Sequence, residues 1–577
     1  MKKKIFLLFL AGMCTSVLFG GCSNKKVTDS ATEQTVSDES NTKTDYSYLL
    51  EDAVNITLSD DKITADGAEV SEDTSNPVYV KNDIIYYEAG HDFTYGAGSE
   101  SDEHSQEEAD AHTVVHITQA GTYRVSGTLS SGQIAIDLGE DAKEDPEAVV
   151  NLILDNADIT CTVAPAVIFY NVYECGSDDE ETATKEVDTS AAGANVYLAE
   201  NSVNHIDGSY VARIYKSYEL SEDGTEVVDN KKLHKYDGAF YSKMSMNVNG
   251  ICEGTGILNI TADNEGLDSE LHLTINGGNI NIQAGNDGIN TNEDNVSVTT
   301  INDGVLNIIV TGETGEGDGI DSNGWIVING GTITAAACST SGDAGIDSDM
   351  GIYINGGTVA ATGNMYDHIE SGDQTFIVFQ FNQRQKGGKT YTLKKGEEIV
   401  AECTPVNDFS YFVLSSPELE ESTYTLWQGD TQLSGTTSTS VGGMMMGGGQ
   451  PPENMEMPED MELPEGMEMP ENGQPLEKPD DMELPEGMEM PEDGQRPELP
   501  EGAEIPEGME KPEDGQSPEK PEGSEGSEAP ENGEAPERPE GNKKPDESAD
   551  SETTENSTDF TLEKGSNFFT NISENDI

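Results

Sequence analysis

Two glycine-containing markers recur through the middle of the sequence with a shared period. The first is Ile-Asn-Gly-Gly or Ile-Asn-Asp-Gly, which begins at residues 275, 301, 328 and 354, so that successive copies lie 26, 27 and 26 residues apart. The second is an acidic turn such as GDGID at 317–321, with related turns around Gly266, Gly288, Gly345 and His368. Two markers with one period predict stacked copies of one structural unit. A spacing of 22 to 27 residues fits a coil of about three short strands and their turns.

Apolar residues beside both markers occupy positions that a strand would turn inward. Leu273 and Ile275 alternate with other residues before the first tetrad, and the later tetrads repeat this alternation. A second inward stack is expected from Leu267, Ile289, Ile320, Ile346 and Ile369. Each tetrad also places an asparagine at one corner, where positive φ and stacked side-chain amides are expected, at Asn276, Asn302, Asn329 and Asn355. The pattern predicts a parallel β-helix.

Other segments carry a resemblance to a known family. They are ITQAGTYRVSGTLSSGQIAID (117–137), NVYLAENSVNHIDG (195–208), DGAFYSKMSMNVNG (237–250) and SSPELEESTYTLWQG (415–429). Together with the repeats, they resemble the bacterial carbohydrate-binding lipoproteins with a right-handed parallel β-helix, a fold similar to that of pectate lyases. The resemblance extends over about residues 50–440. It implies calcium on the helix and a polysaccharide partner of plant type, such as cellulose or an acidic, pectin-like glycan.

Carboxylates recur at one position of the second marker. If Ile320 points inward, its neighbour Asp321 points outward, and its equivalents form a column with about 4.8 Å between coils. From residue 244 to 383 the sequence has 19 Asp and Glu but no Lys or Arg, so no protein cation is expected to offset their repulsion. Calcium takes carboxylate oxygens at roughly 2.3 to 2.6 Å and could bridge adjacent coils. The predicted calcium ligands are Asp268, Asp287, Asp318, Asp321, Asp343, Asp347, Asp349, Asp367 and Glu370. The alternative is a solvated acidic face.

Catalysis stays an open alternative. A polysaccharide lyase needs a base that takes a proton from the uronate ring, usually Lys or Arg in this fold, and the repeats contain neither. Lys235, Lys243 and Arg384 flank the repeats and leave a base from an edge coil conceivable. A glycoside hydrolase would need only a carboxylate pair. Non-catalytic binding is the preferred interpretation, and a calcium-dependent lyase or hydrolase and a structural or adhesive surface protein are the alternatives.

Aromatic side chains suggest where a sugar could stack. Trp325 and Tyr353 fall at outward positions of strands from adjacent repeats, and His272 falls at the position equivalent to Trp325 in an earlier repeat. Flat apolar rings beside polar groups bind sugars well, so these three residues are the candidate carbohydrate-binding residues. Alternatively, one of the acidic inserts covers them.

The N-terminus predicts export. Residues 1–21 have three lysines and then an apolar run too short to span a membrane, and they end in LFGGCS, which resembles a lipobox. Cys22 is therefore the predicted lipidation site, and 22–44 a flexible tether. The body would lie on the extracellular face of the cell membrane, held by lipid. Nucleic acid is not expected as a partner, because the chain has a formal charge of -82.

The chain after the tether divides into four segments. Residues 45–371 form the predicted β-helix and 372–441 a small β unit that caps it, with Trp427 in its core. Residues 442–557 are an acidic Pro/Glu/Met-rich segment whose composition predicts disorder. Residues 558–577 regain strand character and could return to the body.

Overall fold

The computed structural model describes residues 45–221, 224–252, 256–370, 372–441 and 556–574. The predicted signal peptide, Cys22, the tether and residues 442–555 of the acidic segment lie outside the described residues. The described residues belong to one compact unit. None of the helices found in these residues is long and apolar enough to cross a membrane.

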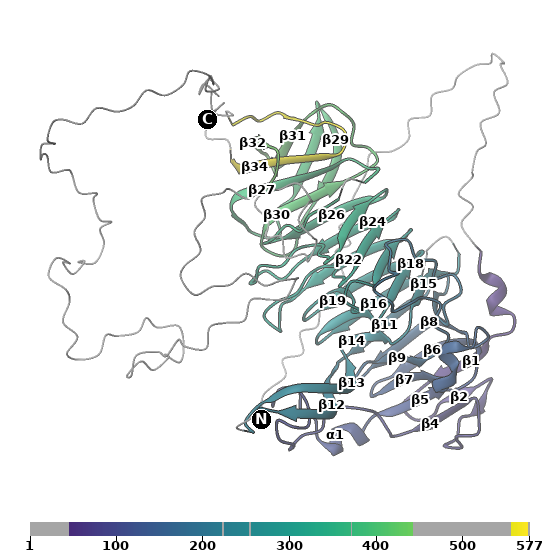
Figure 1. The fold of residues 1–577 in the computed structure, drawn as a ribbon. Helices are drawn as coiled ribbons and strands as arrows, with labels where there is room; N and C mark the ends of the chain where they lie inside the picture. The colour runs from purple at the N-terminus through teal and green to yellow at the C-terminus, as the bar shows by residue number, and fades with distance from the viewer. Residues whose placement is uncertain (1–44, 222–223, 253–255, 371, 442–555, 575–577) are drawn as a thin grey trace, which may run out of the picture. The chain divides into compact units, whose positions relative to one another are not determined.

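The described part of the chain is nearly all β and is dominated by parallel pairing (Figure 1). Within it, helix is confined to η1 (Ser47–Leu50), α1 (Gln106–Asp110) and η2 (Glu140–Glu144). At the N-terminal end, β1 (Val54–Leu58) pairs with β6 (Gly121–Leu129). Strand β6 pairs in turn with the first strand of a long parallel ladder. That first ladder consists of β8 (Val150–Thr160), β10 (Ala194–Leu198), β15 (Met246–Gly250), β18 (His272–Ile275), β21 (Val298–Ile301), β23 (Trp325–Ile328) and β25 (Gly351–Ile354).

A second parallel ladder starts from the later part of β8. Its register shows the repeat directly, since Asn279 pairs with Val305 and Val305 with Thr332, at the same spacing as the tetrads. Its strands after β8 are β11 (Val203–Gly208), β16 (Ile257–Ala262), β19 (Asn279–Ala284), β22 (Val305–Val310), β24 (Thr332–Ala336) and β26 (Thr358–Gly363).

A third, seven-stranded sheet carries the acidic marker. Only its first strand is antiparallel, and an isolated parallel bridge between Ile289 and Ile320 continues the register beyond its last strand. The strands are β4 (Val78–Lys81), β5 (Thr113–Ile117), β7 (Gly132–Asp137), β9 (Val167–Asn171), β14 (Gly238–Ser242), β17 (Glu265–Ser269) and β20 (Ile289–Thr291).

Both predicted inward stacks form the core. Ile275, Ile301, Ile328 and Ile354 are buried, and so are all the members of the second stack, Leu267, Ile289, Ile320, Ile346 and Ile369. Each repeat therefore adds the same apolar side chains on top of those of the previous repeat, so the core is continuous along the ladders.

The predicted asparagine ladder is present. Asn276 donates its side-chain amide to Asn249 at 3.1 Å, and Asn302, Asn329 and Asn355 each donate to the preceding asparagine at 2.9 Å. A second ladder that the sequence analysis missed runs through Asn259, Asn281 and Asn307.

Asparagine and glycine both tolerate the positive φ expected at this corner, and the structure shows that the glycine adopts it. Positive φ belongs to the last glycine of each tetrad, at 102° for Gly278, 114° for Gly304, 83° for Gly331 and 79° for Gly357. The asparagine keeps ordinary backbone geometry, which leaves its amide free to reach the next coil, and the glycine makes the turn.

Residues after 372 form a unit of mostly antiparallel strands. Its strand β30 (Phe409–Ser415) pairs antiparallel with β26 and so ends the second ladder. The unit also contains β27 (Phe376–Gln385), β28 (Tyr391–Lys395), β29 (Glu398–Cys403), β31 (Thr423–Gln428), β32 (Thr431–Ser438) and β33 (Phe560–Thr561). The strand expected near the C-terminus is β34 (Ser566–Glu574), and it does return to the body, between β27 and β32.

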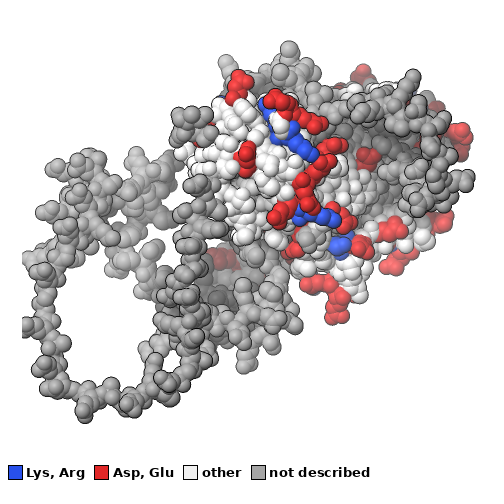
Figure 2. Space-filling view, turned by 90° about the horizontal axis from the view of Figure 1, so that it is seen from above, with Lys and Arg blue, Asp and Glu red and all other residues white. Residues whose placement is uncertain are grey.

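Trp427 is not in the core of this unit, contrary to expectation. It is only partly buried, and Lys394 Nζ lies 4.4 Å from its ring centroid. Two other lysines of this unit form ion pairs, with Lys386 Nζ 2.5 Å from Asp408 and Lys395 Nζ 2.5 Å from Glu420. Figure 2 shows basic side chains lying among acidic ones on one face of the molecule.

Candidate functional site

The acidic marker forms a column on the side of the third sheet that faces away from the core. Asp268 of β17 is in register with Tyr241 of β14 and with Asn290 of β20, and the bridge from Ile289 to Ile320 brings Asp321 to the next position. The predicted column is therefore present. It is not simply a solvated face, because Asp268 is 0% exposed and Asn290 6% exposed.

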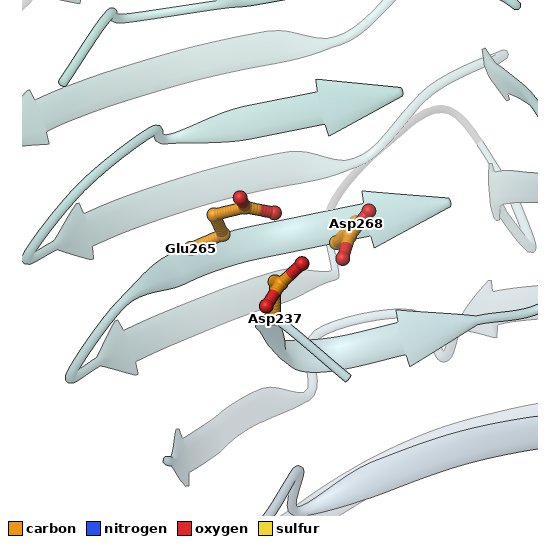
Figure 3. A group of neighbouring side chains, drawn as sticks. All are labelled: Asp237, Glu265 and Asp268. Carbon is orange, nitrogen blue, oxygen red and sulfur yellow. The ribbon is translucent and has the colours of Figure 1, made fainter. Parts of the chain in front are cut away.

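Three carboxylates from two repeats meet in the first of two clusters, called site 1. Asp237 directly precedes β14, and Glu265 and Asp268 belong to β17 (Figure 3). One oxygen from each of the three lies within 4.8 Å of the others, and all three residues are buried. Asp237 and Glu265 were not predicted, although Glu265 precedes Gly266 as Asp287 precedes Gly288 and Asp318 precedes Gly319. The repeat itself was the signal for Glu265.

Two carboxylate oxygens of site 1 have no hydrogen-bond partner in the described part of the protein. Glu265 Oε1 accepts a hydrogen bond from the Asn290 amide at 3.0 Å, and Asp268 Oδ1 accepts one from the Asn292 amide at 2.7 Å. Glu265 Oε2, Asp268 Oδ2 and Asn290 Oδ1 are buried and have no partner among the described residues. Leaving such acceptors unmatched is destabilising by about 1–3 kcal/mol each, and more for charged groups, so their convergence fits a cation.

The pKa values of the site 1 carboxyls reflect this burial. Desolvation raises the pKa of Glu265 well above its usual range, and repulsion from Asp268 and Asp237 raises it further. Desolvation and the nearby Asp237 and Glu270 raise the pKa of Asp268 in the same way. Without a cation, burial and mutual repulsion therefore favour the protonated, uncharged form of these carboxyls.

One protein cation does reach site 1, contrary to the sequence-based expectation. Lys235 Nζ lies 2.5 Å from Asp237 Oδ2, and Lys232 Nζ lies 2.8 Å from Glu270 Oε1. Both lysines lie in β13 (Val227–Tyr236), which forms a hairpin with β12 (Val211–Leu220). The hairpin precedes the lysine-free stretch of 244–383, and only its folding back brings the charges to the column.

A second cluster, called site 2, lies two repeats further on. Oxygens of Asp318, Asp321 and Asp347 lie within 4.8 Å of one another, and the three residues are half-buried. No Lys or Arg of the described residues lies within ion-pair distance of these carboxylates. Site 2 therefore combines three of the predicted calcium ligands with no counter-charge from the described part of the protein.

Burial also raises the pKa values at site 2. The pKa of Asp347 rises to about 7, chiefly through desolvation and then through repulsion from Asp367 and Asp349. Desolvation raises the pKa of Asp318 and of Asp321 well above the usual range. The pKa of the neighbouring Asp287 rises to about 7, with desolvation as the largest cause.

Several predicted ligands bond to the backbone of an adjacent repeat. Asp287 Oδ1 accepts from the Asp318 N–H at 2.7 Å, and Asp318 Oδ1 accepts from the Ala344 N–H at 2.6 Å. Asp343 Oδ2 accepts from the Gly317 N–H at 2.7 Å, and Asp367 Oδ2 accepts from the Ser348 N–H at 3.2 Å. These carboxylates tie adjacent repeats together.

The remaining predicted ligands belong to neither cluster. Asp349 is partly buried, and burial raises its pKa. Glu370 lies 3.9 Å from His368 Nε2, near the end of the ladders. The structure thus brings Asp268 into site 1 and Asp318, Asp321 and Asp347 into site 2, and leaves Asp287, Asp343, Asp349, Asp367 and Glu370 outside these two groups.

The candidate aromatic residues lie on the outer face of the first ladder. His272 has the predicted register with Trp325, through Val298. However, His272 is only 2% exposed, and its Nδ1 accepts from the Val298 N–H at 3.2 Å. Its ring is therefore not available to a sugar, and this part of the aromatic prediction was wrong.

An insert, residues 173–193, covers this part of the face. Thr189 Oγ1 lies 2.7 Å from Asn247 Oδ1 and 2.7 Å from Thr274 Oγ1, so its hydroxyl can donate to the amide oxygen and accept from the Thr274 hydroxyl. Gly176 packs so closely on His272 that a Cβ there would lie 2.6 Å from the ring. Lys185 Nζ lies 4.9 Å from the ring centroid of Tyr353.

Trp325 and Tyr353 both remain partly exposed. Trp325 pairs with Gly351, and Tyr353 pairs with Val327, so the two rings are offset by two residues along neighbouring strands. They could contact successive units of an extended chain, with Lys185 of the insert at the edge.

Comparison with known proteins agrees with a carbohydrate-related protein. Residues 111–376, which include both carboxylate sites and the aromatic face, match the model of the family "Carbohydrate-binding domain-containing protein".

A solved structure described as the polysaccharide lyase-like protein from C. thermocellum, in a gadolinium derivative, is similar to 53% of this chain and 90% of its own, with 21% identity and a TM-score of 0.31. Likeness at that level carries no argument about function. No curated protein sequence matches the chain.

Proposed function

We propose that this protein binds polysaccharide without cleaving it, on the outside of the cell, through a calcium-stabilised right-handed parallel β-helix anchored by a lipid at Cys22. The observation that carries the proposal is the family match over residues 111–376. The order of strands supports the helix, because β16, β17 and β18 enter the second, third and first ladders in turn, and β19, β20 and β21 repeat that order. Three strands per coil is the arrangement that the period predicts.

Calcium is proposed at site 1 and site 2. Two oxygens bound to one calcium ion at roughly 2.3 to 2.6 Å can lie up to about 5 Å apart. The 4.8 Å limit within which each set of carboxylate oxygens falls suits that distance. Asp237, Glu265 and Asp268 would hold one ion, and Asp318, Asp321 and Asp347 another. Bound calcium would neutralise the carboxylates and join adjacent coils.

Trp325 and Tyr353 are the proposed sugar-contacting residues. Their partly exposed rings provide apolar surface, and the partly buried Thr300, which is in register with Tyr353 through Val327, adds a hydroxyl group. A glycan of the cellulose or pectin type has the extended shape that suits a row of strands.

The state of Lys235 argues against this one of the flanking basic residues as a general base. A general base must be able to lose its proton near neutral pH. Burial lowers the pKa of Lys235, but the charge of the neighbouring Asp237 and its hydrogen bond raise the pKa above its usual value. This lysine therefore stays a cation beside site 1.

One experiment tests the proposal. The mature chain would be incubated with neutral and acidic polysaccharides, with calcium or with chelator, while retention and new chain ends are measured together. We expect retention without new ends, and about tenfold weaker retention for Trp325→Ala, which corresponds to about 1.4 kcal/mol. The matched control is Trp427→Ala, which removes the partly buried tryptophan of the C-terminal unit and should leave retention unchanged.

New chain ends would contradict non-catalytic binding and favour the lyase or hydrolase. If no polysaccharide were retained, a structural or adhesive role would be the better explanation.

A further inference from the structure

Three lysines from separate elements gather beside site 1. Lys143 lies in η2, Lys232 in β13, and Lys243 directly after β14. Two backbone hydrogen bonds place Lys143 and Lys243 around the end of β9, since the Lys243 N–H donates to Phe169 O at 2.9 Å and the Glu174 N–H donates to Lys143 O at 3.1 Å. Lys232 is placed through its ion-pair partner Glu270, whose N–H donates to Ser242 O at 2.9 Å, directly before Lys243. This grouping is notable in a chain with 30 basic and 112 acidic residues.

The lysines are close enough to affect one another. Burial lowers the pKa of Lys243, and the charges of Lys143 and Lys232 lower it further. His234 also faces the cluster, and its pKa falls through burial and the charge of Lys243. Like charges held together in this way are stabilised by a bound anion.

The carboxylates that face this lysine cluster already have partners. Glu270 accepts from Lys232 Nζ and from the Tyr241 hydroxyl. Asp137 Oδ1 accepts from the Gly139 N–H at 3.0 Å and from the Asn171 amide at 2.8 Å. No carboxylate of the described residues lies within ion-pair distance of Lys143 or Lys243.

The lysine cluster and site 1 adjoin each other. Glu270, which contacts the cluster through Lys232, is two residues from Asp268 of site 1. A site suited to a cation therefore lies next to one suited to an anion. A chain of uronic acids has regularly spaced carboxylates, which suit the exposed anion site, whereas site 1 is buried.

We propose that Lys143 and Lys243, next to the ion pair of Lys232 and Glu270, bind the carboxylate of a uronic acid unit in an acidic polysaccharide. This inference rests on the proposed polysaccharide-binding function and adds the class of ligand and the place where its charge is recognised. Ammonium groups bind carboxylates through charge-assisted hydrogen bonds, which weaken as salt screens the charges.

A pair of ligands that differ only in charge tests the proposal. De-esterified polygalacturonate carries free carboxylates, and the fully methyl-esterified form has the same sugar backbone without them. Binding of the mature chain to both would be measured in calcium at low and at moderate salt. The test variant is Lys143→Gln/Lys243→Gln, which keeps the Lys232 ion pair intact. The control is Lys389→Gln/Lys564→Gln, which removes two exposed charges from the C-terminal unit.

We expect the unaltered chain to bind the de-esterified form at least tenfold more tightly than the esterified form. The test variant should lose about tenfold in affinity for the de-esterified form only, with a weaker dependence on salt, and the control should behave as the unaltered chain. Equal thermal melts of the variants would show that folding is not the cause.

Three outcomes would overturn the inference. They are equal binding of both esterification states, unchanged binding by the test variant, and equal or tighter binding of a sulfated polysaccharide that depends on the same lysines. All three leave polysaccharide binding itself standing. Absence of binding to any glycan, neutral glycans included, would instead reject the proposed function.

Discussion

Site 1 and site 2 have the same number of carboxylates and different surroundings. Both bring three carboxylates to within 4.8 Å, but those of site 1 are buried and those of site 2 are half-buried. Site 1 has a lysine at 2.5 Å, contributed by a hairpin outside the repeats. Site 2 is built entirely from repeats and has no such lysine in the described part of the protein. The difference shows that a repeated sequence position does not imply a repeated electrostatic environment.

The comparison predicts how strongly each site depends on an ion. At site 1, Lys235 offsets part of the charge, yet Glu265 and Asp268 keep unmatched oxygens. At site 2, repulsion among Asp318, Asp321 and Asp347 has to be relieved by protons or by a bound cation. We therefore expect site 2 to depend more on calcium than site 1.

The largest expected effect is that of calcium removal. A ligand present at about a thousand times its Kd stabilises the folded state by about 4 kcal/mol, so chelation should lower Tm by many degrees. The pair Asp321→Asn/Asp347→Asn should abolish more of this calcium response than Glu265→Gln/Asp268→Asn. Thermal melts with and without chelator measure both. A larger loss for the site 1 pair would reverse the comparison, and a Tm independent of calcium in the unaltered chain would reject ion binding.

The pH dependence of the ion-free protein is the next largest effect. Because the folded pKa values of Asp287 and Asp347 are raised to about 7, their contribution to stability is present below the unfolded value of 3.8 and is lost as pH rises through 7. From pH 5 to pH 8 the loss should be about 3 kcal/mol for one such group.

Calcium should reverse this trend, because it binds the ionised carboxylates. Denaturant unfolding at several pH values checks both statements. The variant Asp321→Asn/Asp347→Asn should have a flatter profile without calcium, and an ion-free protein that becomes more stable from pH 5 to pH 8 would contradict the assignment.

A smaller effect is expected from Lys235→Met, which removes the protein's own cation from site 1. Asp237 would then be buried without its partner. In the absence of calcium we expect the free energy of unfolding to fall by about 2 kcal/mol, which is less than for a fully buried pair because the lysine is partly exposed. Calcium should restore most of that stability. The control is Lys62→Met, which breaks an exposed pair with Glu69 at 3.0 Å and should change stability by less than about 0.5 kcal/mol. Equal effects of the two substitutions would mean that Lys235 does not neutralise site 1.

Much of the repeat architecture could be predicted. The tetrad spacing reappears as the register of the second ladder, and the inward stacks and the asparagine ladder contain the predicted residues. Glu265 could also have been found, because it occupies the position of Asp287 and Asp318 in its own repeat. These features depend on residues one coil apart, and such contacts follow the period of the sequence.

The predictions that failed depend on segments outside the repeats. Lys235 reaches the column through a hairpin, and His272 is buried because residues 173–193 lie across the first ladder. Neither contact leaves a periodic signal. The sequence also left open whether the asparagine or the glycine of each tetrad has positive φ, since both residue types tolerate that conformation and only the amide ladder selects the glycine.

The sequence by itself therefore determined the coil period, the apolar stacks and the column of carboxylates, because each follows from the same side chains repeated at one spacing. The tertiary structure alone decided which carboxylates are buried, which of them meet a lysine and which aromatic rings stay open. Those outcomes depend on where the hairpin and the insert fold, and burial and charge neutralisation arise from groups that are distant in sequence and adjacent in space.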